Sequence, residues 1–250
     1  MPASTTTFHT TAKPRNYFAT THWTIVLTAR DRDPARAGVA LEKLCRTYWY
    51  PLYVYVRRRG HPAEDARDLT QEFFARLLER SWMDRADRQR GRFRSFLLGV
   101  LNHFLAGEWD KARAQKRGGG SSPVPLEVAT AETRYQLEPP DNLTPEISYE
   151  KRWALTLLEN VLEKLRREYQ AEGKAALFAR LECSLTQARA AVRYAELAGE
   201  LRMSEGALRM AVHRLRARYR ELLRSEIADT VLNDNEVEEE LRHLFRVLSA

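Results

Sequence analysis

The stretch RMSEGALRMAVHRLRARYRELL, residues 202–223, combines the apolar spacing of a helix with an unusual excess of arginine. Its apolar side chains recur at steps of four and three residues, which gathers them into one stripe of an α-helix. These residues are Leu208, Val212, Leu215, Tyr219 and Leu222. A second set makes the same steps one residue later, about 100° around the helix axis: Arg209, His213, Arg216 and Arg220. Ser204 is expected to cap the helix at its N-terminus, and Glu205 suits the first turn.

A short helix is predicted directly before this stretch, in YAELAGEL, residues 194–201, with Arg202 and Met203 forming a tight turn. A short helix, a brief turn and a basic helix are typical of a helix-turn-helix, whose second helix enters the major groove of DNA. Residues near the start of the basic helix are expected to approach base edges, and its later arginines to meet phosphates. The candidate duplex-binding residues are Ser204, Glu205, Gly206, Arg209, Met210, His213, Arg214, Arg216 and Arg220. The alternative is a solvated amphipathic helix that binds nothing.

The composition of the chain favours two helical domains. The chain has 250 residues, which is enough for one large core or two small ones. Strand signals are scarce and helical spacing is almost continuous, so the expected fold class is all-α. Residues 118–146 hold three consecutive glycines and five of the ten prolines, which predicts a linker that is flexible at first and extended later. The expected division is therefore a domain over 1–117, a linker over 118–147, and a helix-turn-helix domain over 148–250.

Charge and cysteine content restrict the possible functions. A formal net charge of +7 favours a polyanionic partner or an acidic protein surface. Cys45 and Cys183 lie far apart and have no metal-ligand spacing around them, which indicates a reducing compartment without a zinc site. The N-terminal stretch lacks the apolar core of a signal peptide, and the longest apolar run is too short to span a membrane. We therefore expect a soluble, cytoplasmic protein with no membrane partner.

An enzyme is the least favoured class of protein for this chain. Its six histidines are scattered, and no nucleophile–base pair, phosphate-binding loop or metal motif is present. No catalytic residue, metal ion or cofactor is therefore expected.

Residues 61–80, HPAEDARDLTQEFFARLLER, predict another helix, with acids early and arginines late. Its core stripe is Ala66, Leu69, Phe73 and Leu77. A polar, acidic face lies on another side and consists of Asp65, Asp68, Gln71 and Glu72. Because no histidine or cysteine joins these acids, we do not predict a metal site there. A solvated face is the plain alternative to a binding surface.

Residues 91–120, GRFRSFLLGVLNHFLAGEWDKARAQKRGGG, interleave aromatic and basic side chains around a predicted helix. Such a mixture suits single-stranded DNA, whose unstacked bases can lie on aromatic rings. The basic candidates are Arg92, Arg94, Lys111, Arg113, Lys116 and Arg117. Most of the aromatic residues are also expected to serve as core.

The C-terminal segment, residues 226–250, is acidic, with seven acids against Arg242 and Arg246. Val237, Leu241, Leu244, Phe245 and Leu248 follow helical spacing in it. We expect a terminal helix that packs onto the second domain; a protein-docking tail is the alternative.

Two of these motifs resemble those of bacterial sigma factors of the extracytoplasmic-function type. Residues 194–222 resemble their promoter-binding helix-turn-helix, and the matching positions are Tyr194, Glu196, Leu197, Ala198, Ser204, Glu205, Gly206, His213, Arg214 and Arg216. Arg202 stands where the family usually has glycine, and would need a positive φ. DLTQEFF, residues 68–74, resembles the family helix that binds the clamp helices of RNA polymerase.

The resemblance implies a function for each predicted domain. Residues 91–120 are similar to the family segment that captures the melted −10 element, with Asn102 and His103 in place of an Arg-Asn pair. Domain 1–117 would then bind polymerase and the −10 element, and domain 148–250 the −35 element. The implied partners are core RNA polymerase, through the clamp helices and flap of its large subunits, and promoter DNA, with an anti-sigma factor as an optional further partner. The alternative function is that of a helix-turn-helix regulator that acts without polymerase.

Overall fold

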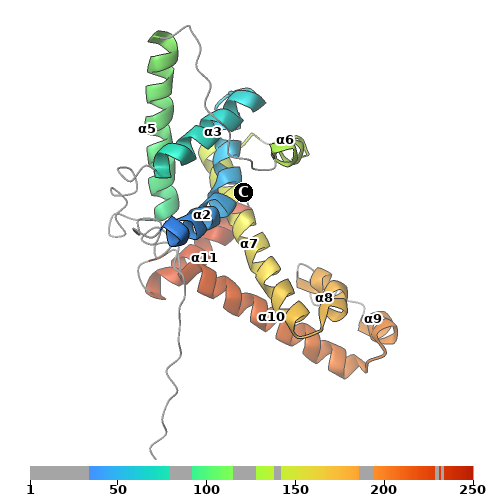
Figure 1. Ribbon diagram of the computed structural model, residues 1–250. Coiled ribbons are helices and arrows are strands. Elements are labelled where there is room, and N and C mark those ends of the chain that lie inside the picture. Colours follow the sequence, from blue (N-terminus) through green and yellow to red (C-terminus); the bar gives the residue numbers. More distant parts are fainter. Residues whose placement is uncertain are drawn as a thin grey trace, which may run out of the picture.

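The computed structural model describes residues 34–78, 92–114, 128–137, 142–185, 194–228, 231 and 234–249. All regular secondary structure within these ranges is helical, which confirms the expected all-α class (Figure 1). The elements are α2 (Pro34–Arg58), α3 (Ala63–Leu78), α5 (Phe93–Ala114), α6 (Val128–Gln136), α7 (Pro145–Ala171), α8 (Ala175–Leu181), the 3₁₀ helix η2 (Glu182–Leu185), α9 (Tyr194–Leu201), α10 (Glu205–Ala228) and α11 (Asp234–Leu248).

Helix α2 lies at the centre of the larger of two hydrophobic clusters. Residues 47–56, TYWYPLYVYV, are all buried, as expected of a helix with apolar and aromatic side chains on every side. Tyr48 meets Phe93 of α5 edge to face at 5.5 Å, and Tyr55 meets Tyr149 of α7 at 6.3 Å. Helices α3, α5 and α7 thus pack around one aromatic core.

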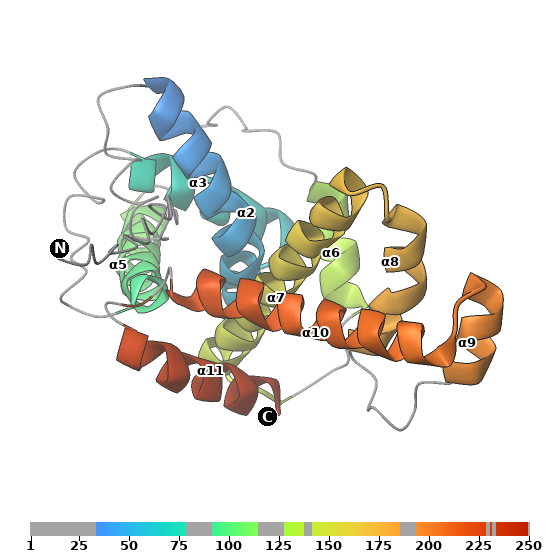
Figure 2. The ribbon, with the colours of Figure 1, turned by 90° about the horizontal axis from the view of Figure 1, so that it is seen from below.

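Helices α7 and α10 belong to both hydrophobic clusters. The N-terminal half of α7 and the C-terminal end of α10 pack with α2, α3, α5 and α11 in the first cluster. The smaller cluster consists of Leu165, Phe178, Leu181, Ala198, Leu208, Val212 and Leu215, from α7, α8, α9 and α10. In Figure 2 the two long helices cross near the centre of the molecule, where they are in contact, and from there α7 leads toward α8 and α10 toward α9. The packing of the described residues therefore divides within α7 and α10.

The expected linker contains a packed helix, α6. Glu132 accepts hydrogen bonds from Tyr53 and from Arg57, whose Nη2 lies 3.0 Å from Glu132 Oε1. Arg134 covers the ring of Tyr50 at 4.4 Å and pairs with Glu159 of α7 at 2.6 Å. An extended conformation was thus the wrong expectation for residues 128–136, because this segment has polar partners on both α2 and α7. Residues 118–127 and 138–141 lie outside the described ranges.

A buried ion cluster connects α5, α7 and α11. Arg94 of α5 is 3% exposed, and its Nε lies 2.7 Å from Oε2 of Glu150 in α7. Its Nη1 pairs with Glu240 of α11, which is fully buried. The guanidinium also lies over the ring of Trp153 at 4.2 Å. His243 of α11 reaches the same Glu150 oxygen at 3.0 Å. The cluster joins residues 146 positions apart in sequence.

Helix α11 packs on α7 and α10, as expected for the C-terminal segment, and also reaches α5 through Glu240. Val237 and Leu244 are buried, and Leu241 and Leu248 are partly so. Phe245 is 61% exposed, so its expected place in the packed face was wrong. The face of α11 that contacts α7 and α10 is too narrow to include Phe245.

We predict that Glu240→Gln lowers the free energy of unfolding by about 3 kcal/mol, because it removes one of the two charges that compensate a buried guanidinium. Glu239→Gln on the same helix is the matched control, since Glu239 is exposed and its substitution should change stability by less than about 0.5 kcal/mol. Urea denaturation at low protein concentration measures both. Equal midpoints for the two variants would contradict the structural role of the Arg94 cluster.

Candidate nucleic-acid interface

The turn between α9 and α10 has the conformation that the sequence predicts. Arg202 has a φ of 51°, in the left-handed region that usually favours glycine. The Met203 amide donates to the Ala198 carbonyl at 3.0 Å, which satisfies the end of α9. Ser204 caps α10, since its Oγ accepts a hydrogen bond from the Ala207 amide at 3.2 Å. The two helices therefore meet in a defined, three-residue turn.

The apolar stripe of α10 faces the smaller cluster. Leu208 and Leu215 are fully buried and Val212 nearly so, while Tyr219 and Leu222 are packed along one side. This burial fixes which face of α10 turns outward. The outward residues among the candidates are Ser204, Glu205, Gly206, Arg209, Met210, His213, Arg214 and Arg220, all of them exposed.

Arg209 is held at the start of the exposed face. Its guanidinium lies over the ring of Tyr194 in α9 at 4.8 Å and reaches Glu205 at 3.3 Å. A shallow pocket of about 340 Å³ lies beside it, lined by Tyr194, Arg209, Met210, Val212, His213, Arg216 and Arg220. An aromatic wall with several guanidinium groups suits an anion or the edge of a nucleobase.

Two later arginines of α10 have structural partners. Arg216 is half-buried and donates from Nε and Nη2 to the Ser184 carbonyl, at 3.0 and 2.6 Å. Arg218 holds Glu168 of α7 through two hydrogen bonds of 2.8 and 2.6 Å, which raise the pKa of its guanidinium. Arg216 thus supports η2, and Arg218, whose side chain is 46% exposed, ties α10 to α7. Arg214 and Arg220 remain exposed.

The acidic face of α3 is divided in two. The predicted core stripe is confirmed, because Ala66, Phe73 and Leu77 are buried and Leu69 is packed against them. Asp65 and Asp68 are exposed; Asp68 pairs only with the adjacent Arg67 among the salt bridges of the described residues, at 2.9 Å.

The other two residues of this face, Gln71 and Glu72, are half-buried. Glu72 pairs with Arg76, which also contacts Glu108 of α5 at 2.9 Å and lies over the Phe104 ring at 5.0 Å. Glu72 thus takes part in the contact between α3 and α5, while Asp65 and Asp68 face outward.

The candidates for single-stranded DNA do not share one surface. Arg94 is buried in the ion cluster, so the expectation that it meets DNA is wrong. Arg92, 36% exposed, pairs with Glu240 at 2.9 Å. Asn102 accepts a hydrogen bond from the Tyr55 hydroxyl at 2.7 Å, whereas His103 is exposed. The side chains of Lys111 and Arg113, and all of Lys116 and Arg117, lie outside the described part.

The burial of Arg94 is indicated by its spacing in the sequence, although its residue type suggests an exposed position. Arg94, Leu97 and Leu101 lie at steps of three and four, which places the arginine on the buried face of α5. Its acidic partners, Glu150 and Glu240, are distant in sequence and carried no such signal. Tyr194 was matched to the family motif, but its contact with Arg209 was not foreseen.

Among the described residues, no group of histidine, cysteine and acidic side chains could hold a metal ion. Nor does the described part contain a helix long and apolar enough to cross a membrane. Comparisons with protein families, with curated proteins and with solved structures found no match for this chain. The sequence motifs and the geometry of α3, α9 and α10 are therefore the features that bear on function.

We predict that Arg202→Gly stabilises the chain by about 1 kcal/mol, because glycine adopts a positive φ without the steric cost of a side chain. In a protein of this size the melting temperature should rise by about 2–4 °C. Arg202→Ala is the control and should give no such rise, since alanine keeps the Cβ. A gain that is equal for glycine and alanine would show that the side chain, and not the backbone, is the source of the strain.

Proposed function

We propose that this chain is a promoter-specificity subunit of bacterial RNA polymerase, a sigma factor of the extracytoplasmic-function type. The observation that carries the proposal is the unit of α9, turn and α10, in which the apolar stripe is buried and a row of basic residues faces outward. Its residues match the promoter-binding motif of that family. The turn lies at the same position in both, although Arg202 stands there in place of the usual glycine. A protein of this kind performs no chemistry; it recognises DNA and positions the polymerase.

In this proposal α10 enters the major groove at the −35 element as the second helix of a helix-turn-helix. Arg209 lies one turn from the N-terminus of α10, where such helices contact base edges. Its contacts with Tyr194 and Glu205 restrict the side chain before DNA arrives, so less conformational entropy is lost on binding. Arg214 and Arg220 are exposed further along and would meet phosphates.

The polymerase contact is proposed for α3. Asp65 and Asp68 project from a helix whose other side is firmly packed, so they form a rigid acidic surface. A basic coiled coil such as the clamp helices would be electrostatically complementary to it. Glu72 would contribute less than the sequence motif suggests, because it already pairs with Arg76.

Capture of the opened −10 element is proposed for α5. Of the candidates on α5 with described side chains, His103 is the one that is exposed, and Asn102 offers its amide beside it. An unpaired base held there would offset an unpairing cost of a few kcal/mol. Arg94 has no part in this step, since its charge is used within the core.

A helix-turn-helix regulator that acts without polymerase is the second candidate. The observation that favours it is the packing of both clusters on the shared helices α7 and α10, which resembles one body more than two tethered domains. Transcription by core polymerase from a library of genomic promoter fragments, with and without this chain, distinguishes the two. New start sites that depend on the chain support the sigma factor; DNA binding without them supports the regulator.

We predict that Arg209→Glu weakens binding to a selected promoter duplex by at least about fivefold, since a contact to a base edge contributes about 1–3 kcal/mol. Arg167→Glu makes the same change in net charge at a residue of α7 that is 66% exposed, and serves as the control. Fluorescence anisotropy at one fixed salt concentration measures both. Equal losses of duplex affinity for the two variants would show that net charge alone causes the effect. They would contradict the proposal that Arg209 enters the major groove.

The reverse pattern is expected for Asp68→Lys. This variant should bind core polymerase several-fold more weakly, because it places a cation against a basic partner surface, and should bind the isolated duplex as the wild-type chain does. Glu172→Lys, at the far end of α7 and also exposed, is the matched control. Co-elution with core polymerase over a concentration series gives the affinities. Unchanged binding by Asp68→Lys would exclude α3 as the docking helix.

A further inference from the structure

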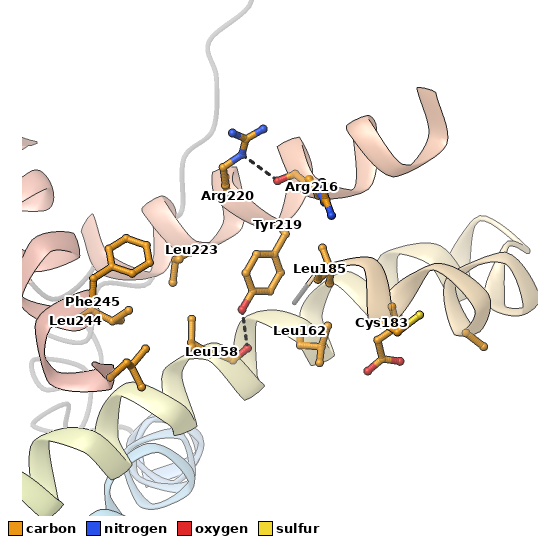
Figure 3. A pocket seen from close by; sticks show the side chains of 13 residues that line it. Leu158, Leu162, Cys183, Leu185, Arg216, Tyr219, Arg220, Leu223, Leu244 and Phe245 are labelled. Atoms are coloured by element: carbon orange, nitrogen blue, oxygen red, sulfur yellow. Dashed lines mark hydrogen bonds between the residues drawn. The ribbon is translucent and has the colours of Figure 1, made fainter. Parts of the chain in front are cut away.

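An apolar groove lies between α7, η2, α10 and α11 (Figure 3). Its volume is about 900 Å³, and its apolar lining includes Leu158, Leu162, Leu185, Tyr219, Leu223 and Leu244. The Tyr219 ring extends from α10 toward α7, where its hydroxyl donates to the Leu158 carbonyl at 3.4 Å. Burial raises the pKa of this hydroxyl to about 12, so it stays a proton donor at neutral pH. Packed side chains form the bottom of the groove, so its shape is defined in the single chain.

Phe245 lies at the edge of this groove and is 61% exposed. A single exposed apolar residue is common on protein surfaces, but this ring adjoins a groove whose lining includes the buried Leu244 and the partly buried Leu248. The same surface therefore carries both a hydrophobic hollow and a hydrophobic projection. Within one chain the Phe245 side chain does not fill the groove.

The charges around the groove are also of both signs. Arg216 and Arg220 of α10 line it, and among the described residues Arg220 has no acidic partner. Glu238 of α11, 52% exposed, lies seven residues before Phe245 and so on the same face of the helix, about 10 Å along it. Its present partner is Arg224, in a solvent-exposed pair of the kind that contributes little stability.

We propose that the occupant of this groove is a second copy of the chain, related by a two-fold axis. In a two-fold interface the same patch serves both partners and must be complementary to itself. Phe245 of each copy enters the groove of the other, and Glu238 of each approaches the other's Arg220. An unrelated helical partner would need only the groove. The surface also carries the exposed Phe245 and charges of opposite sign, Arg220 and Glu238, and this combination fits a second copy of the same surface. This proposal does not rest on the proposed function, but the two share Arg220, which cannot pair with Glu238 of a second copy while it meets a DNA phosphate.

Sedimentation velocity of the full chain over about 1–200 μM, a range that detects micromolar association, tests the proposal. The expected result is a concentration-dependent shift from 29.0 kDa to twice that mass. A reductant must be present because Cys183 is exposed; burial raises the pKa of the Cys45 thiol to about 11, which leaves it little reactive. A chain that stays monomeric over the whole range overturns the proposal.

Variants identify the surface. Phe245→Asp should weaken dimerisation by at least about tenfold, as expected for a central aromatic anchor. Val39→Asp alters a residue of α2 that is 67% exposed and should leave the dimer unchanged. Arg220→Glu and Glu238→Arg should each weaken association, and the double variant should recover it in part. Equal dimerisation by Phe245→Asp and Val39→Asp, or a double variant weaker than both single ones, would refute the arrangement.

Discussion

The buried guanidinium of Arg94 is the interaction on which the arrangement of the larger cluster depends. A charge removed from water is tolerated only when opposite charges and hydrogen bonds replace the solvent. Here Glu150 comes from α7 and Glu240 from α11, and the Trp153 ring covers the remaining face. Because each partner belongs to a different helix, the requirement to neutralise one side chain sets the relative position of three segments that are remote in sequence.

The features of the chain that could be predicted are those determined by neighbours along it. The stripe from Leu208 to Leu222 and the Ser204 cap follow from spacings of a few residues, and the positive φ of Arg202 is what the family resemblance implied. Pairings across the fold left no comparable pattern. Arg94 looked like a DNA-binding arginine beside aromatic residues, and only its distant acids show that it is structural. Helix α6 could not be predicted from the sequence for a related reason. Prolines and glycines dominate the residues around it, and Glu132 and Arg134 find their stabilising partners on α2 and α7.

The arginines that share one face of α10 differ in their contacts. Arg209 and Arg220 are exposed, whereas Arg216 is half-buried and bonded to η2. Helical periodicity determines which side chains share a face, but the neighbouring elements determine how much of that face stays open. The proposed DNA surface is therefore narrower than the sequence suggested, and it lies toward the N-terminus of α10. The acidic face of α3 is reduced in the same way by the pairing of Glu72.

Helix α7 has 27 residues, which makes it about 40 Å long, and its two ends are embedded in different hydrophobic clusters. A rod held in this way acts as a lever. If the Trp153 end turned by about 5°, Leu165, about 18 Å further along the helix, would swing by about 1.5 Å, as the rise per residue dictates. Because α10 contacts α7 and is anchored in the same two clusters, the pair resists such tilting. A molecule that presses on the aromatic core around α2 would therefore shift the orientation of α9 only if both helices moved together.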